Sequence, residues 1–219
     1  MNKKGIIISG GSIDEPFALE QIKKIEPDVI IGVDSGLAFL YHNEVMPTHI
    51  VGDFDSAAPE IVSYYKESTQ IPIRQFNPVK DASDTEIAVR MAIELEVGEL
   101  WLLGATGTRL DHVMANIQVL KIALDAKIKA YILDCYNRIS LVEGEVCLSK
   151  KDAYGPYFSI FPLGGFIEGL DITGAKYPLV NHKLSPYDSL CVSNQILGEE
   201  ARITFPEGII ILMETRDRK

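Results

Sequence analysis

The sequence predicts an α/β domain with a mainly parallel sheet, followed by an all-β sandwich. Two observations carry this prediction. Up to residue 136, short apolar runs alternate with segments of helical periodicity, which is typical of βαβ units. After residue 136, short apolar segments are separated by turn-forming residues and no long amphipathic helix is evident. We therefore expect two domains, residues 1–136 and 137–219.

The first part contains six apolar runs that predict strands and five periodic segments that predict helices. The expected strands are residues 5–9, 28–33, 49–52, 71–76, 99–104 and 128–134. The expected helices are residues 15–25, 36–42, 59–66, 84–96 and 111–126. The fourth helix is the clearest, because Ile87, Met91 and Leu95 recur every four residues and Ser83 with Glu86 forms a capping box.

The second part contains five shorter apolar segments. The expected strands are residues 139–142, 157–162, 190–194, 201–205 and 209–214. The turn signals between these segments are Glu143-Gly144, Gly164-Gly165, Thr173-Gly174 and Pro206-Glu207-Gly208. This spacing favours a small antiparallel sandwich or barrel.

Composition limits the classes of partner. The formal charge of −10 argues against nucleic acid, because a phosphate backbone requires a basic surface. The longest aliphatic runs are too short to span a bilayer, and no signal peptide is recognisable. The three cysteines are widely spaced and form no CxxC pattern, which favours a reducing compartment. We expect a cytoplasmic protein that binds neither membrane nor nucleic acid.

Aspartates follow the apolar runs at four places where a strand should end or a helix should begin. They are Asp34, the pair Asp53 and Asp55, the pair Asp81 and Asp84, and Asp111. In an open α/β sheet such positions converge on the ligand crevice at the carboxyl ends of the strands. Carboxylates that meet there repel one another unless a cation lies among them, which suggests Mg²⁺ and, with it, phosphates.

The segment Asp53-Phe54-Asp55 is the most compact of these motifs. An extended backbone would put both carboxylates on one face, roughly 6.5 to 7 Å apart along the chain. They could then share one metal ion or hold separate oxygens of a metal-bound triphosphate. The motif alone is equally compatible with an acidic loop.

Two further motifs open helices. The first runs from Lys80 to Thr85; Lys80 could neutralise phosphate charge, although Ser83 and Asp84 would also suit any helix start. The second runs from Gly104 to His112, where two glycines allow backbone amides to approach a phosphate closely. Neither a Walker A loop nor a GxGxxG fingerprint occurs in the chain.

Within the second motif, Arg109 offers a fork of donors to phosphate oxygens. Asp111 could bind metal or orient a hydroxyl group, and His112 could contact substrate. A lone histidine at a helix start is more often structural.

The ordered set of motifs resembles the thiamine pyrophosphokinase family over nearly the whole chain. The motifs are Asp34-Ser35-Gly36, Gly52-Asp53-Phe54-Asp55-Ser56, Asp81-Ala82-Ser83-Asp84, the segment from Gly104 to His112, Lys176-Tyr177-Pro178-Leu179 and Ser193-Asn194. The resemblance implies an α/β domain, a β-sandwich and a homodimer with active sites between subunits. It also implies a reaction in which ATP and thiamine give thiamine diphosphate and AMP, with Mg²⁺.

The same resemblance assigns roles to residues. It gives Asp53, Asp55 and Asp84 the role of metal ligands. The catalytic set comprises these three together with Asp81, Arg109 and Asp111. Nucleotide or phosphate binding falls to Asp34, Lys80, Thr85, Thr106, Gly107, Arg109, His112 and Asn116. Thiamine binding falls to Ser193 and Asn194. One departure is Ser35, because the family commonly has Asp-Gly-Gly at positions 34–36, which puts the local backbone in question.

We hypothesise in-line attack of the thiamine hydroxyethyl oxygen on the β-phosphorus of ATP, with AMP as the leaving group. Asp111 or Asp81 could accept the hydroxyl proton. Two alternatives stay open: a pyrophosphokinase for another heterocyclic alcohol such as a pterin, and a non-catalytic sensor of nucleotide or thiamine diphosphate.

Overall fold

The computed structural model describes residues 3–75, 82–187 and 189–218, and the predicted site residues Lys80 and Asp81 lie outside them. The chain divides into two compact units, Met1–Cys135 and Tyr136–Lys219. None of the helices in the described ranges is both long and apolar enough to cross a bilayer.

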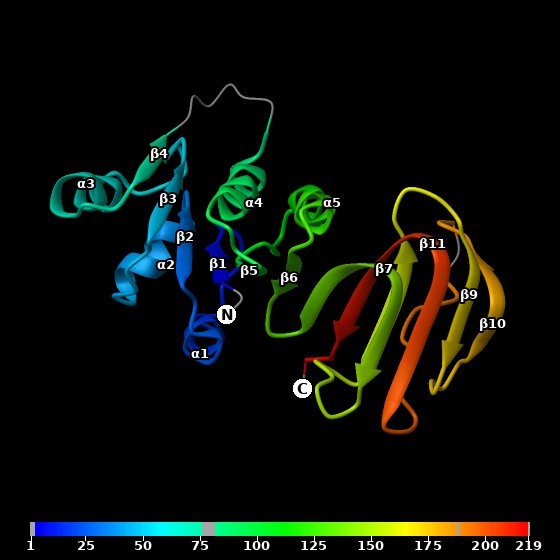
Figure 1. The fold of residues 1–219 in the computed structure, drawn as a ribbon. Helices are drawn as coiled ribbons and strands as arrows, with labels where there is room; N and C mark the ends of the chain where they lie inside the picture. Colours follow the sequence, from blue (N-terminus) through cyan, green and yellow to red (C-terminus); the bar gives the residue numbers. More distant parts are fainter. Residues whose placement is uncertain (1–2, 76–81, 188, 219) are drawn as a thin grey trace. The chain divides into compact units, whose positions relative to one another are not determined.

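The first unit alternates strands and helices along its whole length (Figure 1). Its elements are β1 Lys4–Ile8, α1 Glu15–Ile25, β2 Val29–Val33, α2 Gly36–His42, β3 His49–Gly52, α3 Pro59–Ser68, β4 Ile73–Gln75, α4 Asp84–Glu94, β5 Glu99–Leu103, α5 Leu110–Asp125 and β6 Lys129–Leu133. Every helix and strand expected here is present, with ends shifted by a few residues. The predicted α/β class is confirmed for this part of the chain.

The sheet of the first unit is parallel, with the strand order β6-β5-β1-β2-β3-β4. The chain proceeds outward from β1 to β4 in one direction and then returns to β5 on the other side of β1. The strand order therefore reverses between β1 and β5. In open α/β sheets the ligand crevice lies at such a switch point, beyond the carboxyl ends of the strands.

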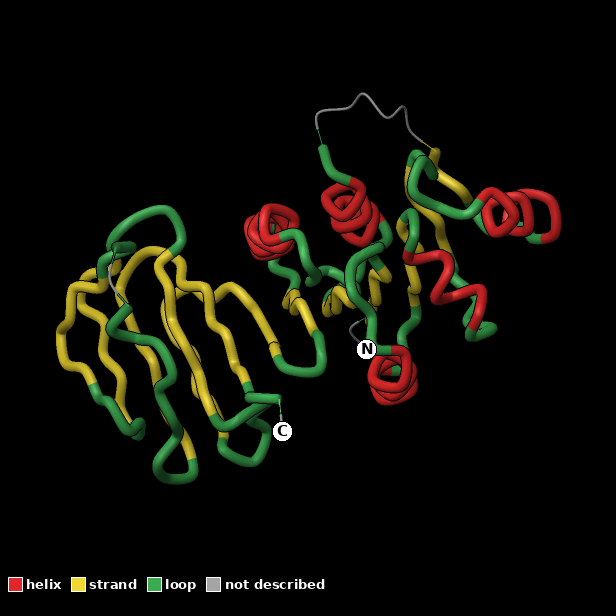
Figure 2. The backbone as a smooth tube through the Cα atoms, turned by 180° about the vertical axis from the view of Figure 1, so that it is seen from behind, coloured by secondary structure: helices red, strands yellow, loops and turns green. Residues whose placement is uncertain are grey.

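Helices cover both faces of this sheet (Figures 1 and 2). The pair α4 and α5 lies over one face, and α1 and α2 lie over the other. The residues of the inner strands are buried on both sides as a result, and Ile6, Ile7 and Ile8 in β1 are wholly inaccessible to solvent. Continuous apolar runs of this kind are typical of parallel strands between two helical layers.

The second unit contains strands and no helix within its described residues. Its elements are β7 Asn137–Ser149, β8 Tyr157–Pro162, β9 Ile167–Thr173, β10 Leu179–Leu184 and β11 Glu200–Thr215. The long strand β11 pairs with β7 along its length, with β9 through its first half and with β8 through its second half, always antiparallel. The predicted all-β second part is confirmed.

Several strand boundaries expected in this unit are wrong. The predicted strands 201–205 and 209–214 form one strand, β11, because Pro206-Glu207-Gly208 makes a bulge and not a turn. Gly144, at φ 73°, lies opposite this bulge inside β7. The predicted strand 190–194 is a loop with a single bridge from Asn194 to Phe158, since Ser193 takes a left-handed conformation at φ 58°. The strands β9 and β10 were not expected.

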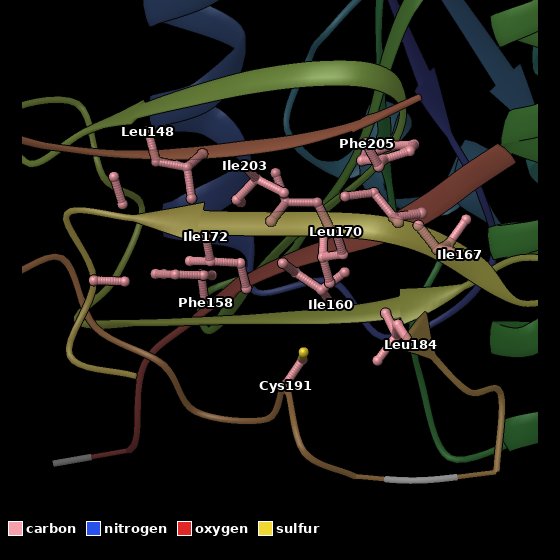
Figure 3. Close-up of a cluster of buried hydrophobic side chains, with 14 residues drawn as sticks. Leu148, Phe158, Ile160, Ile167, Leu170, Ile172, Leu184, Cys191, Ile203 and Phe205 are labelled. Atoms are coloured by element: carbon pink, nitrogen blue, oxygen red, sulfur yellow. The ribbon is translucent and has the colours of Figure 1, made fainter. Parts of the chain in front are cut away.

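The second unit has its own apolar core (Figure 3). Side chains from all five strands meet in one cluster, together with Cys191 from the loop before β11. The labelled members are Leu148, Phe158, Ile160, Ile167, Leu170, Ile172, Leu184, Cys191, Ile203 and Phe205. Burial of this many large side chains supplies the main driving force for folding this unit.

Candidate active site

A cavity of about 590 Å³ lies at the carboxyl ends of the strands of the first unit. The loops after β1, β2 and β5 line it, together with the first turns of α4 and α5. This is the switch point of the sheet. Eight predicted site residues line the cavity: Asp34, Asp84, Thr85, Thr106, Gly107, Arg109, His112 and Asn116.

Carboxylates crowd together on one side of this cavity. Burial, followed by the charge of the neighbouring Asp84 and a hydrogen bond with it, raises the pKa of Asp34 to about 7. The charge of Asp53 contributes in the same direction, while a hydrogen bond from the Phe54 N–H to Asp34 Oδ1, 3.3 Å long, opposes it. Asp34, Asp53 and Asp84 thus come together, as the convergence argument predicts.

The Asp53–Asp55 segment is a tight turn, and the expected extended backbone is wrong. The Asp55 N–H donates to Asp53 Oδ1 at 3.1 Å, and Phe54 takes a left-handed conformation at φ 65°. An aspartate side chain that binds the backbone two residues on is a common turn device. Lys66 from α3 lies over the Phe54 ring, 5.4 Å from its centre.

The carboxylate oxygens of Asp34, Asp53 and Asp84 suit Mg²⁺. Two carboxylates in hydrogen-bonding contact must share a proton, and a divalent cation would replace that proton. Among the described residues, no three His, Cys, Asp or Glu side chains could hold one metal ion without rearrangement. Mg²⁺ requires only one or two carboxylates and takes its other oxygens from water and phosphate, so the donor set fits.

The loop after β5 has its carbonyl groups engaged. The Gly104 carbonyl accepts from Gly11 N–H at 2.7 Å, and the Thr106 carbonyl accepts from Ser12 N–H at 2.7 Å. Between them, the Ala105 carbonyl accepts from the buried Asn116 amide at 2.8 Å.

The backbone N–H groups that follow are not engaged. Across the described ranges, those of Thr106, Gly107 and Thr108 have no hydrogen-bond partner. A loop with satisfied carbonyls and unengaged amides beside a helix N-terminus is suited to bind an anion.

Arg109 and Asp111 form an ion pair with each other. Arg109 Nη2 lies 2.6 Å from Asp111 Oδ2, Arg109 Nε lies 3.2 Å from Asp111 Oδ1, and both side chains are exposed. Hydrogen bonds from Arg109 lower the pKa of Asp111 to about 2. Asp111 is therefore a weak base in this arrangement. Arg109 and His112 line the cavity, whereas Asp111, Asp53 and Asp55 stand outside its wall.

Comparison with known proteins shows two family matches that divide the chain between them. Residues 23–132 match the catalytic domain of thiamin pyrophosphokinase, and residues 145–210 match its vitamin B1 binding domain. The thiamine pyrophosphokinase of Bacillus subtilis is 30% identical over 187 residues, which cover 85% of this chain and 87% of the relative. The chain belongs to the thiamine pyrophosphokinase family.

Solved structures agree with this assignment. A thiamine pyrophosphokinase from Bacillus subtilis superposes with a TM-score of 0.87 over 99% of this chain and 100% of the other, at 28% identity. The yeast enzyme, at 16% identity and a TM-score of 0.80, covers 97% of this chain and 86% of its own and shares the fold. The predicted activity, an ATP-dependent diphosphotransferase acting on thiamine, stands, and nothing favours the pterin or sensor alternatives.

The departure of this chain from the family pattern at Ser35 does not disturb the backbone. Ser35 has φ −63° and ψ −14°, an ordinary right-handed conformation that does not require glycine. Its hydroxyl donates to the Gly10 carbonyl at 3.3 Å and so ties the loop after β2 to the loop after β1. The carboxylate of Asp34 is retained beside it.

The loop after β1 lines the cavity and was not predicted. Ser9, Gly10, Gly11 and Ser12 all belong to the wall. A Cβ on Gly11 would lie 2.3 Å from the Thr106 carbonyl oxygen, so only glycine allows the two loops to approach. The signal was available, because these small residues directly follow an apolar strand at the switch point.

Two further residues of the cavity wall have buried side chains that contact the neighbouring loops. Thr85 is buried, and its hydroxyl contacts the Ser9 hydroxyl at 3.2 Å. Asn116 is also buried and uses its amide to hold the Ala105 carbonyl. Both were predicted to bind nucleotide or phosphate, and their contacts fix the loops after β1 and β5, which line the cavity.

The predicted thiamine-binding residues lie in the second unit. Asn194 is buried, and its side chain donates to the Tyr177 carbonyl at 2.8 Å and accepts from the Tyr177 N–H at 3.0 Å. Ser193 is exposed, and its N–H donates to the Ser159 hydroxyl at 3.0 Å. Asn194 therefore joins the two C-terminal signature motifs of the family to each other.

Proposed function

We propose that the cavity of the first unit binds ATP with Mg²⁺ and carries out diphosphate transfer to the hydroxyethyl group of thiamine. The strongest support is that a loop suited to bind an anion and a cluster of carboxylates line the same cavity. The unengaged N–H groups of Thr106, Gly107 and Thr108 suit phosphate oxygens. The carboxylates of Asp34 and Asp84 suit the metal that such phosphates carry.

Each charged residue has a role in this proposal. Asp84, with Asp53 and Asp34 beside it, would hold Mg²⁺, and Asp55 is given a part in the same metal site from the sequence alone. Mg²⁺, when bound, would neutralise and orient the phosphate oxygens. Arg109 at the start of α5 would offset charge on the transferred group. From the sequence alone, we propose that Lys80 also offsets charge on the transferred group. On the same basis, Asp81 belongs to the carboxylate cluster.

The transfer would proceed by in-line attack. The thiamine hydroxyl oxygen forms a bond to the β-phosphorus, the bond from that phosphorus to the oxygen bridging the α- and β-phosphates breaks, and AMP leaves. The hydroxyl proton passes to a carboxylate. Asp81 or Asp111 is the proposed acceptor; hydrogen bonds from Arg109 lower the pKa of Asp111, which makes Asp111 a weaker base while that ion pair is intact.

Thiamine would be held by the second unit, which includes the match to the vitamin B1 binding domain. In our proposal Ser193 and Asn194 help to hold thiamine, and the Asn194 side chain also fixes the backbone at Tyr177 and Gln195. We further propose that the protein acts in the cytoplasm as a homodimer with active sites between subunits, as the family resemblance implies.

Steady-state product analysis tests the function. The purified protein is incubated with ATP, Mg²⁺ and thiamine, and AMP and thiamine diphosphate are quantified. Equal amounts of both, abolished by EDTA and restored by excess Mg²⁺, are expected. ADP with thiamine monophosphate, or AMP release with a pterin alcohol but not with thiamine, would contradict the proposal.

A further inference from the structure

The Thr106 hydroxyl is already committed within the protein. Its Oγ1 donates to Asp134 Oδ2 at 2.9 Å. A hydroxyl has one hydrogen to donate, so Thr106 cannot donate from its side chain to a phosphate oxygen while this bond is made. What Thr106 offers to an anion in the cavity is its backbone N–H.

Asp134 occupies the same kind of position as the predicted site aspartates. It directly follows β6, the strand that pairs with β5, so it stands at the carboxyl edge of the sheet beside the Thr106 loop. It is half-buried, and it does not belong to the cavity wall. Its carboxylate is joined to the cavity wall through the Thr106 hydroxyl.

We propose that Asp134 is a positioning residue of the active site, whose carboxylate anchors the Thr106 hydroxyl and thereby fixes the N–H groups of residues 106–108 for phosphate binding. This inference rests on the proposed function. The carbonyls of residues 104–106 are held by Gly11, Asn116 and Ser12. The bond to Asp134 adds a side-chain anchor for Thr106 at the point where the unengaged amides begin.

Preorganised donors matter because catalysis by positioning is lost when the donors can move. A displacement of about 1 Å at such a site can cost about 100-fold in rate. Removing the anchor retains the N–H donors but no longer fixes their positions. The effect should therefore fall on the use of ATP and spare the binding of thiamine.

The test compares Asp134→Ala, Asp134→Asn and Thr106→Val. We expect Asp134→Ala to lower kcat/KM for ATP by about 10- to 100-fold with the KM for thiamine unchanged. Asp134→Asn keeps an acceptor oxygen at the same place and should recover most of this loss. Thr106→Val removes the donor and should match Asp134→Ala, and the double variant should be no worse than either single one. Asp125→Ala, at an exposed ion pair on α5, is the matched control.

Three results would overturn the inference. They are full ATP use by Asp134→Ala, no recovery in Asp134→Asn, and losses that multiply in the double variant.

Amide hydrogen exchange separates this inference from the proposed function. Asp134→Ala should speed exchange of the Gly11 and Ser12 N–H groups, which donate to the Gly104 and Thr106 carbonyls of this loop, whether or not the parent turns over ATP. Unchanged exchange in these residues would contradict the positioning role. If the parent protein forms no AMP while Asp134→Ala still exchanges faster than the parent, the proposed function is contradicted and the positioning role is not.

Discussion

The contact between Asp34 and Asp84 is the strongest electrostatic feature of the candidate site. Folding brings both carboxyl groups from separate loops to one place, and burial with the charge of Asp84 raises the pKa of Asp34 to about 7. Such a pair costs stability unless a cation or a proton lies with it. Proteins retain arrangements of this kind at functional sites.

Asp84→Asn should lower kcat/KM by about 100- to 1,000-fold, because it removes a charge from the group assigned to the metal. Its melting temperature should stay within about 4 °C of the parent, since relief of repulsion with Asp34 offsets the loss of a favourable charge at the start of α4. Kinetic assay and thermal unfolding measure the two effects. Asp125→Asn serves as control, and equal activity of Asp84→Asn and this control would remove Asp84 from the site.

Gly52→Ala should lower activity through Asp34. A Cβ at position 52 would lie 2.0 Å from Asp34 Oδ1, so the carboxylate must move away. We expect kcat/KM to fall at least about tenfold and stability to fall by about 1 kcal/mol. In Gly165→Ala the new Cβ meets no atom within 4 Å, and it should change neither quantity. Similar activity in both variants would show that the position of Asp34 is unimportant.

Much of the site was predictable from single residues. Residues that follow apolar strands converge because the carboxyl ends of parallel strands share an edge, so Asp34, Asp84 and Thr106 could be grouped without a structure. The local backbone was not predictable in the same way. Phe54 turns into a left-handed conformation because Asp34 and Asp53 accept hydrogen bonds around it, and such contacts arise only after folding.

At the scale of elements, the second unit is stabilised by a buried ion pair between its two longest strands. Glu214 in β11 is buried and accepts two hydrogen bonds of 2.6 Å from Arg138 in β7. It also accepts from the Tyr154 N–H at 3.2 Å. These bonds satisfy the carboxylate and connect the strands to the loop before β8.

Glu214→Ala should lower the free energy of unfolding by about 3 kcal/mol, because it leaves Arg138 without its buried partner. Glu168→Ala breaks an ion pair whose side chains are 71% and 59% exposed and should cost less than about 1 kcal/mol. Urea denaturation followed by circular dichroism compares them. Equal costs would mean that burial of Glu214 does not set its contribution.

Prediction of the elements succeeded and failed for physical reasons. In the first unit most strands that flank a helix in sequence are buried on both faces, so their continuous apolar runs contrast clearly with the helical period. In the second unit glycine and proline interrupt the long strands without ending them. Pro206 and Gly208 form a bulge in β11 opposite Gly144, a feature that resembles a turn in sequence because bulges and turns favour the same residues.

At the scale of the whole molecule, the two units divide the two family matches between them. The second unit also carries exposed apolar side chains in the loop around Ser193, including Leu190, Val192 and Leu197. Exposed apolar surface in such a loop is typical of contact with another molecule.

Light scattering coupled to size-exclusion chromatography should therefore give twice the chain mass of 24.2 kDa. Leu190→Ser together with Leu197→Ser should shift the protein toward the monomer, whereas Leu19→Ser, on an exposed face of α1, should not. A parent protein that elutes only as a monomer would contradict the homodimer.

The most direct test of the account follows the phosphorus atoms of ATP. The parent protein, Mg²⁺ and thiamine are incubated with ATP labelled at the α-phosphate with one isotope and at the γ-phosphate with another. Transfer of an intact diphosphate should place all the γ-label in thiamine diphosphate and all the α-label in AMP. A γ-label found in thiamine monophosphate or in free phosphate, with the α-label in ADP, would contradict it.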